Sequence, residues 1–282
     1  MEAGQAGRGG LAVTLGEGRP GWHIECSAMS MKYLGETFDI HGGGPDLKFP
    51  HHENEIAQSE AATGHEFARY WMHAGAVRVN KEKMSKSLGN FFTIRDVLKT
   101  HPAEVIRFFL VSSHYRSPID YSEDSLNEAR QGLDRLYNAL AGLPPAVGEK
   151  PVSGDWSERF ENAMLDDFNS REAIAVLFDM AREINRLKKD GRTDEASDLG
   201  ALMVRLAEPL GVLQQAPEAF LQGRKTGEGR ISVEEIEALI QARTEARARK
   251  DWAESDRIRD LLKEKGVLVK DGREGTTWQW EA

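Results

Sequence analysis

The sequence has very little cysteine and no long hydrophobic run. Cys26 is the only cysteine among 282 residues, which excludes an internal disulfide and is typical of a reducing compartment. No run of about 18 apolar residues is present, so we expect no membrane-spanning helix. The first residues lack the basic and then apolar layout of a secretory signal. Together these absences predict a cytoplasmic, globular chain with no membrane partner.

An excess of positive charge is also absent. The formal net charge of −9 at pH 7 gives no overall signal for nucleic-acid binding, although a local basic patch can act against the mean charge. The hydrophobic content of 40% is ordinary for a soluble protein. A chain of this length has room for two or three domains with their own cores, and it contains no internal repeat.

The most informative positive feature is a short loop with the sequence KMSKS at residues 83–87. It places Lys83 and Lys86 three residues apart. Two ammonium groups on a polar loop can bind a polyphosphate and stabilise its charge while a leaving group departs. Lysines at this spacing are usually just part of a solvated loop, but the full five-residue string is much rarer and favours a phosphate site.

Two longer strings precede this loop. They are GRPGWHIECSAM at residues 18–29 and a segment at residues 38–60 that contains three glycines and ends in HHENEIAQSE. In this order and spacing, with the lysine loop, they make residues 18–282 closely resemble bacterial cysteinyl-tRNA synthetases, the cysteine–tRNA ligases. The resemblance implies an aminoacyl-tRNA ligase of protein biosynthesis that activates cysteine with ATP and Mg and transfers it to tRNA-Cys. We expect a monomer.

Parts of the family pattern are absent from this sequence. The family's N-terminal nucleotide-binding half carries a His-Ile-Gly-His-type signature and an early cysteine, and neither is found here. Residues 1–17 form a Gly/Ala-rich segment with no visible match to the family. We therefore expect the C-terminal part of such an enzyme, as a truncated product, a fragment or one half of a split protein, and we expect it to be inactive alone.

The same resemblance, read together with the hydrophobic periodicity, predicts a mostly α chain. We expect an α/β remnant of a class I synthetase Rossmann domain, followed by a helical bundle and a small α+β anticodon-binding module. The expected segments are an unmatched N-terminal piece (1–17), the second half of the Rossmann domain (18–80), the lysine-loop and stem-contact region (81–121), the bundle (122–213), a linker (214–231) and the anticodon-binding-like module (232–282).

Local signals place several elements within these segments. A capping box that begins at Thr93 predicts a helix start, and Ser122 is expected to cap a longer helix. Residues 267–269 and 278–280 are expected to pair as a hairpin. One apolar stripe predicts a further helix of the bundle. Its members are Phe160, Met164 and Phe168.

A candidate metal site follows from three residue types. His51 and Glu55 are four residues apart, so they share a face if they lie on a helix, where a nitrogen and a carboxylate one turn apart can hold one metal ion. Cys26 offers a thiolate, and zinc accepts sulfur, nitrogen and oxygen donors. From spacing alone, a buried apolar cysteine and an ordinary surface His–Glu pair are the simpler interpretation.

The resemblance to the ligase family favours the metal site over this simpler interpretation. It implies that Cys26, His51 and Glu55 bind one zinc ion together with the early cysteine, which this sequence lacks, so we expect zinc to bind this chain weakly or not at all. His52 is expected to face elsewhere as a hydrogen-bonding or packing residue. Zinc would let the enzyme separate cysteine from serine by thiolate chemistry, because a simple pocket separates near-isosteres poorly.

The resemblance also assigns the nucleotide site and the cysteine pocket. Lys86, with Lys83 beside it, is expected to act as a catalytic residue that contacts the phosphates of ATP. The residues expected to meet adenosine are Gly43, Gly44 and Asp46. The residues expected to line the amino-acid pocket are Trp22, His23 and His41. For the two histidines and the tryptophan, ordinary core packing is an equally good interpretation of the sequence alone.

The C-terminal region carries a locally basic strip. Its members are Arg243, Arg247, Arg249, Lys250, Arg257, Arg259, Lys263 and Lys265. Phosphate contact is one interpretation of the strip, and a solvated face balanced by neighbouring acids is the other. Trp278 and Trp280 are candidates for stacking on an unpaired base, although core packing of one of them is the simpler expectation.

Two other functions stay open on the sequence. One is a non-catalytic tRNA-binding or complementing fragment that joins a separate N-terminal half. The other is a relative of small-molecule cysteine ligases, whose relationship to the family explains an ATP-and-zinc core equally well. The apparent anticodon-binding module at residues 232–282 argues against the second of these.

Overall fold

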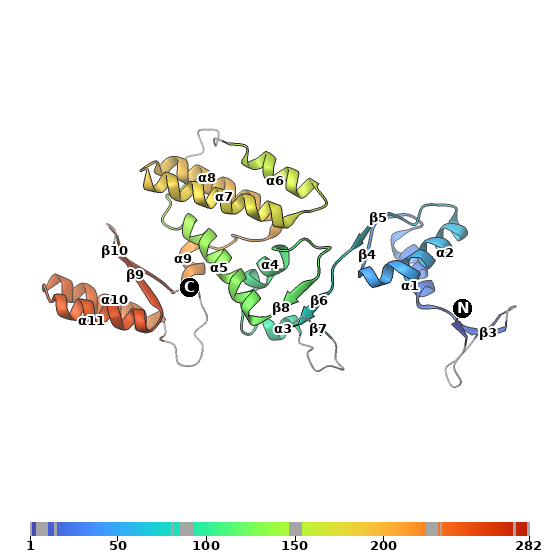
Figure 1. Ribbon diagram of the computed structural model, residues 1–282, viewed down its shortest axis with the longest axis horizontal. Coiled ribbons are helices and arrows are strands. Elements are labelled where there is room, and N and C mark those ends of the chain that lie inside the picture. Colours follow the sequence, from blue (N-terminus) through green and yellow to red (C-terminus); the bar gives the residue numbers. More distant parts are fainter. Residues whose placement is uncertain are drawn as a thin grey trace. The chain divides into compact units, whose positions relative to one another are not determined.

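The chain folds into two compact units, which the computed structural model assigns to Met1–Lys83 with Tyr115–Asp120 and to Met84–His114 with Tyr121–Ala282. Figure 1 labels the elements of each unit. The described residues are 2–3, 11–13, 16–79, 82–84, 93–146, 154–223, 231, 233–272 and 275–280. No helix among them is both long and apolar enough to cross a membrane.

The first unit is built on a parallel β–α–β arrangement. Strands β4 (Phe38–Gly43) and β5 (Ala68–His73) pair in parallel, and helix α2 (Glu53–Thr63) lies between them in the chain. Helix α1 (Trp22–Leu34) precedes β4. Parallel strands need such a crossover connection, and α/β sheets are made from this unit. The predicted α/β character of this part of the chain is confirmed.

Shorter elements lie before, between and after the strands of the parallel pair in the chain. The 3-10 turn η1 (Pro45–Leu47) and the π-type turn η2 (Lys48–His52) connect β4 to α2. Two small sheets have the orders β1-β3-β2 and β7-β6-β8. Their strands are β1 (Glu2–Ala3), β2 (Leu11–Val13), β3 (Gly16–Arg19), β6 (Val77–Val79), β7 (Glu82–Lys83) and β8 (Ile119–Tyr121). The apolar cluster of this unit is small, with Phe38, Phe67 and Ala68 buried and Met31 and Trp71 packed against them.

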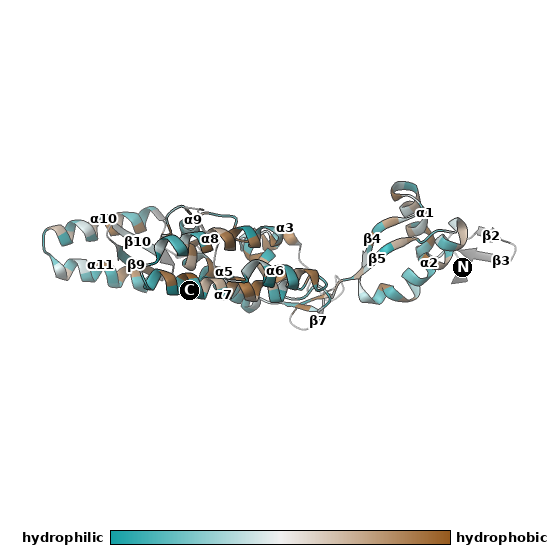
Figure 2. Cartoon of the chain, turned by 90° about the horizontal axis from the view of Figure 1, so that it is seen from above, coloured by the Kyte–Doolittle hydropathy of each residue, from teal (hydrophilic) through white to brown (hydrophobic). Residues whose placement is uncertain are grey.

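The second unit contains the predicted helical bundle. Its helices are α3 (Ile94–Val97), α4 (Ala103–Val111), α5 (Glu123–Leu140), α6 (Trp156–Leu165), α7 (Ser170–Lys189), α8 (Thr193–Ala207), the 3-10 turn η4 (Glu208–Leu210) and α9 (Pro217–Gln222). A continuous cluster of buried apolar side chains runs through α4 to α9, with Leu133, Leu177 and Met203 at its centre. Figure 2 shows hydrophobic residues gathered on the bundle helices.

Side-chain caps define where two of these helices begin. Thr93 Oγ1 accepts a hydrogen bond from the Asp96 amide at 3.2 Å, and the Asp96 carboxylate accepts one from the Thr93 amide at 3.3 Å, so the predicted capping box is confirmed. Ser122 Oγ accepts from the Ser125 amide at 3.1 Å, also as predicted. Each cap of this kind stabilises its helix by about 1 kcal/mol.

Two expectations for the bundle are wrong. Helix α6 ends at Leu165, and Phe168 lies beyond it in the left-handed region (φ 54°) with an exposed side chain, so the apolar stripe stops earlier. The segment 214–231 is more than a linker, because it contains α9. Phe220 of α9 is buried, and its ring stacks on Tyr137 with 4.0 Å between centroids. That tertiary contact holds a helix that the Pro- and Gly-rich local sequence does not suggest.

The C-terminal module consists of two helices and a hairpin. Helices α10 (Val233–Ala248) and α11 (Trp252–Glu264) precede strands β9 (Val267–Gly272) and β10 (Gly275–Trp280). The strands pair antiparallel with Val269 opposite Trp278, which confirms the predicted hairpin. The buried core of the module is Ile236, Ile258, Leu262, Val267 and Trp278.

Candidate functional site

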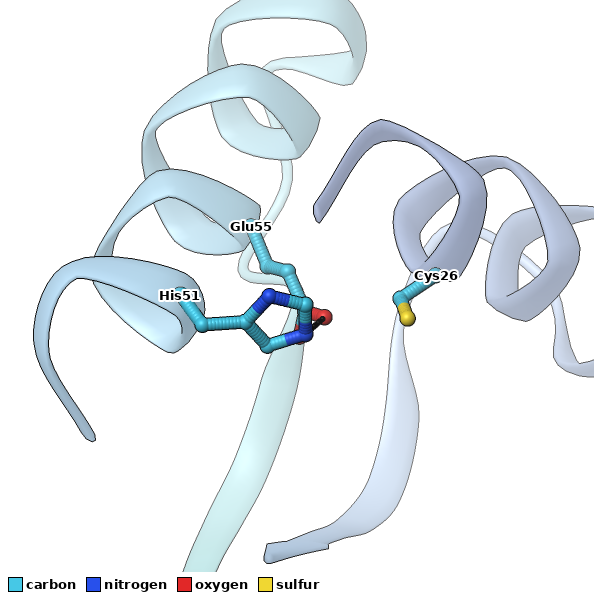
Figure 3. A group of neighbouring side chains, drawn as sticks. All are labelled: Cys26, His51 and Glu55. Atoms are coloured by element: carbon cyan, nitrogen blue, oxygen red, sulfur yellow. Dashed lines mark ion pairs between the residues drawn. The ribbon is translucent and has the colours of Figure 1, made fainter. Parts of the chain in front are cut away.

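Three elements of the first unit bring the predicted metal ligands together. Cys26 lies on α1, His51 in η2 and Glu55 on α2, and one donor atom of each lies within 4.8 Å of the other two. Figure 3 shows the His51 imidazole beside the Glu55 carboxylate, with Cys26 approaching from the other helix. The sequence places His51 on a helix, and it lies in the π-helical turn η2, directly before α2. Because this turn continues directly into α2, His51 Nε2 still lies 2.8 Å from Glu55 Oε1.

The Glu55 carboxylate is the electrostatic centre of this cluster. Its side chain is 0% exposed, and its second oxygen lies 2.7 Å from Nε2 of His41. Neither oxygen has a hydrogen bond of acceptable geometry within the described part of the chain, although both lie close to imidazole nitrogens. A buried carboxylate in this state is costly unless a cation neutralises it. The surrounding sulfur, nitrogen and oxygen donors match the preferences of zinc, so these residues fit a zinc ion.

Burial and the same carboxylate affect the pKa of the Cys26 thiol. Burial raises the pKa of this thiol above its ordinary value, and the negative charge of Glu55 raises it further, with a smaller effect from Glu25. Cys26 therefore stays protonated at neutral pH until a metal ion displaces the proton. Metal binding to the cluster is expected to release this proton.

A layer of rings lies behind the carboxylate. His41 packs edge-on against Trp71 with 4.6 Å between centroids, and His52 lies 5.0 Å from His41. His52 is buried, and its Nδ1 is 3.0 Å from Nε2 of His73. Burial, followed by the charges of neighbouring histidines, lowers the pKa of His52 to about 4, so this ring is neutral at pH 7. The expected hydrogen-bonding and packing role of His52 is confirmed, but the expectation that it faces elsewhere is wrong, because one donor atom each of His52, His41 and Glu55 lie within 4.8 Å of one another.

His73 is a residue of this cluster that the sequence analysis did not identify. It ends β5 and is the register partner of Gly43, the last residue of β4. Ligand sites in parallel sheets lie where the carboxyl ends of the strands meet. A polar residue at the end of the second strand was therefore the available signal.

The residues predicted for the amino-acid pocket lie around the metal candidates. Trp22 is 61% exposed, and its ring is 4.7 Å from the ring of His51. His23 meets His51 edge-on at 6.3 Å, while His41 contacts the Glu55 carboxylate. The exposure of Trp22 contradicts the alternative that it is only a core residue.

The predicted nucleotide residues are less well tested by the structure. A Cβ atom on Gly43 would lie 2.8 Å from Cε1 of His52, so packing against this ring already requires a glycine there. Asp46 is exposed in η1. Lys83 contributes its backbone to β7, and Lys86 lies outside the described residues. Contact of these residues with ATP stays a prediction.

Half of the C-terminal basic strip is engaged in ion pairs. Arg243 is buried and donates two hydrogen bonds to Asp271 at 2.8 and 2.9 Å. Arg247 Nη1 lies 3.0 Å from the same carboxylate. Arg257 and Arg259 pair with acids of their own helix. For these four arginines, the balanced face described above is the better interpretation.

The turn between α10 and α11 keeps several groups exposed. Arg249 and Lys250 are exposed, and neither forms an ion pair within 4.0 Å among the described residues. The hydrogen bond from Arg257 and, to a smaller extent, the charge of Arg249 lower the pKa of Glu254. Trp252 begins α11 and is 59% exposed, whereas Trp278 is 6% exposed in the core of the module. The side chain of Trp280 lies outside the described part of the structure. Among the described tryptophan side chains of the module, Trp252 is therefore the one available for stacking, and its sequence signal was its position beside two cations.

Three family models match consecutive parts of the chain. Residues 4–131 match the tRNA synthetases class I (C) catalytic domain, residues 159–214 the DALR domain, and residues 233–278 the cysteinyl-tRNA ligase anticodon binding domain. The first match includes most of the segment 1–17. The expectation that this segment has no counterpart in the family is therefore wrong.

Curated relatives named cysteine–tRNA ligase match almost the whole chain. The relative from Hahella chejuensis (strain KCTC 2396) is 66% identical over 268 residues, which cover 94% of this chain and 57% of the relative. The relative from Marinobacter nauticus is 62% identical over 264 residues, with the same two coverages. That from Halorhodospira halophila is 58% identical over 278 residues, 99% of this chain and 59% of the relative. The chain thus spans less than two thirds of the length of these relatives.

Proposed function

Because this chain belongs to the cysteine–tRNA ligase family, we propose that it carries the metal-binding and tRNA-binding parts of an enzyme that uses ATP to join cysteine to tRNA-Cys. One observation carries the proposal. The thiol of Cys26 and the imidazole of His51 converge on the buried Glu55 carboxylate, which has no hydrogen bond among the described residues. A site of this kind suits a cation next to a thiol-bearing substrate.

In this proposal, Cys26, His51 and Glu55 hold one zinc ion as three donors of a tetrahedral site. When bound, zinc supplies a soft Lewis acid that prefers a thiolate to a hydroxyl. Trp22, exposed beside His51, is available to contact the substrate. Selection by sulfur chemistry is useful because a simple pocket distinguishes a near-isostere such as serine only about a hundredfold.

We propose that the ATP phosphates, accompanied by Mg, meet the lysine loop. Lys86, with Lys83, would stabilise the charge that develops on the departing pyrophosphate. Gly43, Gly44 and Asp46 would approach the adenosine, with the carboxylate on a ribose hydroxyl. The support is the lysine string at residues 83–87 together with the catalytic-domain match over residues 4–131.

We propose further that the chain alone does not activate cysteine at a useful rate, because its sequence contains no His-Ile-Gly-His-type element to work opposite the lysine loop. Cysteine-dependent exchange of pyrophosphate into ATP tests this with the pure, zinc-supplemented chain. We expect background exchange alone and restored exchange after addition of a polypeptide that carries the signature. Lys86→Ala should then lower the restored rate by about 100-fold or more. Robust exchange by the pure chain would contradict the proposal.

Binding of tRNA without catalysis is the second candidate, favoured by the anticodon-binding match over residues 233–278. A gel-shift titration with tRNA-Cys tests it. Binding combined with failure of every complementation would favour this candidate. The same module disfavours a small-molecule cysteine ligase, because the substrates of such an enzyme include no tRNA and therefore no anticodon.

A further inference from the structure

The buried side chains of α1 and α2 are polar. The buried residues of these two helices are Ser27 on α1 and Glu55 and Ser59 on α2. The apolar cluster of the unit includes no residue of α2 and reaches α1 only through Met31. Hydrophobic burial is non-directional and contributes little here. Hydrogen bonds, which are directional, must therefore set how α1 lies against α2.

Gln58 supplies these hydrogen bonds. It lies three residues after Glu55 on α2, and its Nε2 donates to the backbone oxygen of His23 at 2.7 Å and to Oγ of Ser27 at 2.5 Å. His23 precedes Cys26 by three residues and Ser27 follows it directly. One side-chain amide thus binds α1 on both sides of Cys26. This amide lies about one helical turn along α2 from Glu55, the carboxylate that the thiol faces.

We propose that Gln58 and Ser27 are positioning residues that hold the Cys26 thiol against Glu55 and His51. The consequence for metal binding depends on the function proposed above. Zinc–sulfur bonds are short, about 2.3 Å, so a small slide of α1 carries the sulfur out of range of an ion held by α2. Substitution of residues that orient metal ligands in this way typically lowers metal affinity about 10–100-fold.

Gln58→Leu in the full chain removes both hydrogen bonds while keeping a side chain of similar size. Ser27→Ala is the milder variant, because the bond to His23 is retained. Thr37→Val is a matched control, since Thr37 Oγ1 also donates to a distant backbone oxygen, that of Glu66 at 2.5 Å, where β4 and β5 begin. Thermal unfolding of each variant reports whether it is folded.

Two measurements report on the position and accessibility of the Cys26 thiol. Titration with cobalt(II) alone gives the metal affinity and the intensity of the thiolate-to-cobalt absorption band. The alkylation rate of Cys26, the only cysteine of the chain, reports how well the packing of α1 against α2 shields the thiol without any metal. For Gln58→Leu we expect a cobalt affinity about 10–100-fold lower and a weaker band per bound ion. Metal-free alkylation should be at least roughly fivefold faster, since the loss of a single hydrogen bond already has about this effect and both are removed. Ser27→Ala should change both in the same direction but less, and Thr37→Val should change neither.

The outcomes separate this inference from the proposed metal site. Wild-type affinity, band and alkylation rate in Gln58→Leu would overturn the inference, even if cobalt binds well. Absence of a thiolate band in the wild-type chain, together with faster alkylation of Gln58→Leu, would overturn the metal site and support the placement of the thiol by Gln58. A loss of stability in Gln58→Leu with both thiol measurements unchanged would show a merely structural role and would also overturn the inference.

Discussion

At the scale of single residues, Glu55 decides what the candidate site can do. Its carboxylate is fully buried between two imidazole nitrogens at 2.7 and 2.8 Å, without a hydrogen bond among the described residues. Such a group opposes folding when it carries an unneutralised charge, and it favours binding when a cation arrives. Stability and metal affinity should therefore respond to it in opposite directions.

Glu55→Gln tests this opposition. At pH 8 we expect the metal-free variant to be more stable by about 1 kcal/mol, because a buried charge is removed. Zinc affinity, measured by competition with a chelator, should fall by about 100-fold or more. Glu53→Gln, on the exposed face of the same helix, should change neither quantity. A metal-free Glu55→Gln variant that is less stable than wild type would show that the carboxylate is already neutralised.

At the scale of elements, buried polar groups connect segments that are distant in the chain. Glu104 of α4 accepts hydrogen bonds from the Tyr137 hydroxyl on α5 at 2.8 Å, from the Leu213 amide at 2.6 Å and from Gln215 Nε2 at 2.7 Å. Arg243 and Asp271 connect α10 to the hairpin in the same way. These bonds fix how helices and strands meet, which apolar packing alone leaves variable.

The Arg243–Asp271 pair has a pH dependence of defined sign. The hydrogen bonds from Arg243 hold the pKa of Asp271 well below its usual range. The folded state therefore binds this proton more weakly than the unfolded chain. The stabilisation that this ion pair gives is complete above the pKa of Asp271 in the unfolded chain, about 3.9. It is lost as pH falls from there through the pKa of Asp271 in the folded state.

Asp271→Asn should lower the free energy of unfolding by about 2 kcal/mol at pH 7, because a buried guanidinium loses its charged partner. The expected loss of stability is moderate because the Asp271 side chain is 40% exposed. Urea unfolding at pH 7 and pH 3 checks it, and the difference from wild type should be smaller at pH 3. Asp260→Asn, in an exposed pair with Arg259 at 3.7 Å, should change stability by less than about 0.5 kcal/mol. An equal loss at both pH values would contradict the assignment.

At the scale of the whole molecule, the candidate chemistry is divided between the two units. The first unit carries the thiol, imidazole and carboxylate cluster, and the second carries the bundle and the module that matches an anticodon-binding domain. The net charge is −9, so attraction to RNA must come from local cations. Because Arg243, Arg247, Arg257 and Arg259 are paired with acids, the turn that holds Arg249 and Lys250 is the better candidate for phosphate contact.

The double variant Arg249→Ala/Lys250→Ala tests this candidate. We expect weaker binding of tRNA-Cys and a slope of log affinity against log salt that is shallower by about 2, one for each lost phosphate contact. Fluorescence anisotropy over a salt series measures both. Arg186→Ala/Arg192→Ala removes two cations that pair with acids on the bundle and should leave the slope unchanged. An unchanged slope in the first variant would place the phosphate contacts elsewhere.

Much of this architecture was open to prediction from the sequence. The helix caps at Thr93 and Ser122 and the hairpin of residues 267–272 and 275–280 follow from signals within a few residues of each other. The ligand trio was open to prediction through its spacing and its resemblance to a known family. Helix α9 was not, and His73 and Trp252 had only weak sequence signals, because their roles depend on what lies opposite them in space.

The family, the mostly helical content and the pairing of His51 with Glu55 follow from the amino-acid sequence, since each depends on order and spacing along the chain. The neutralised cations, the exposure of Trp252 and the groups that hold the thiol of Cys26 are visible in the folded chain alone. Those properties depend on burial and on hydrogen bonds between segments far apart in sequence, as between Gln58 and Ser27. The chain encodes such contacts only through the complete fold.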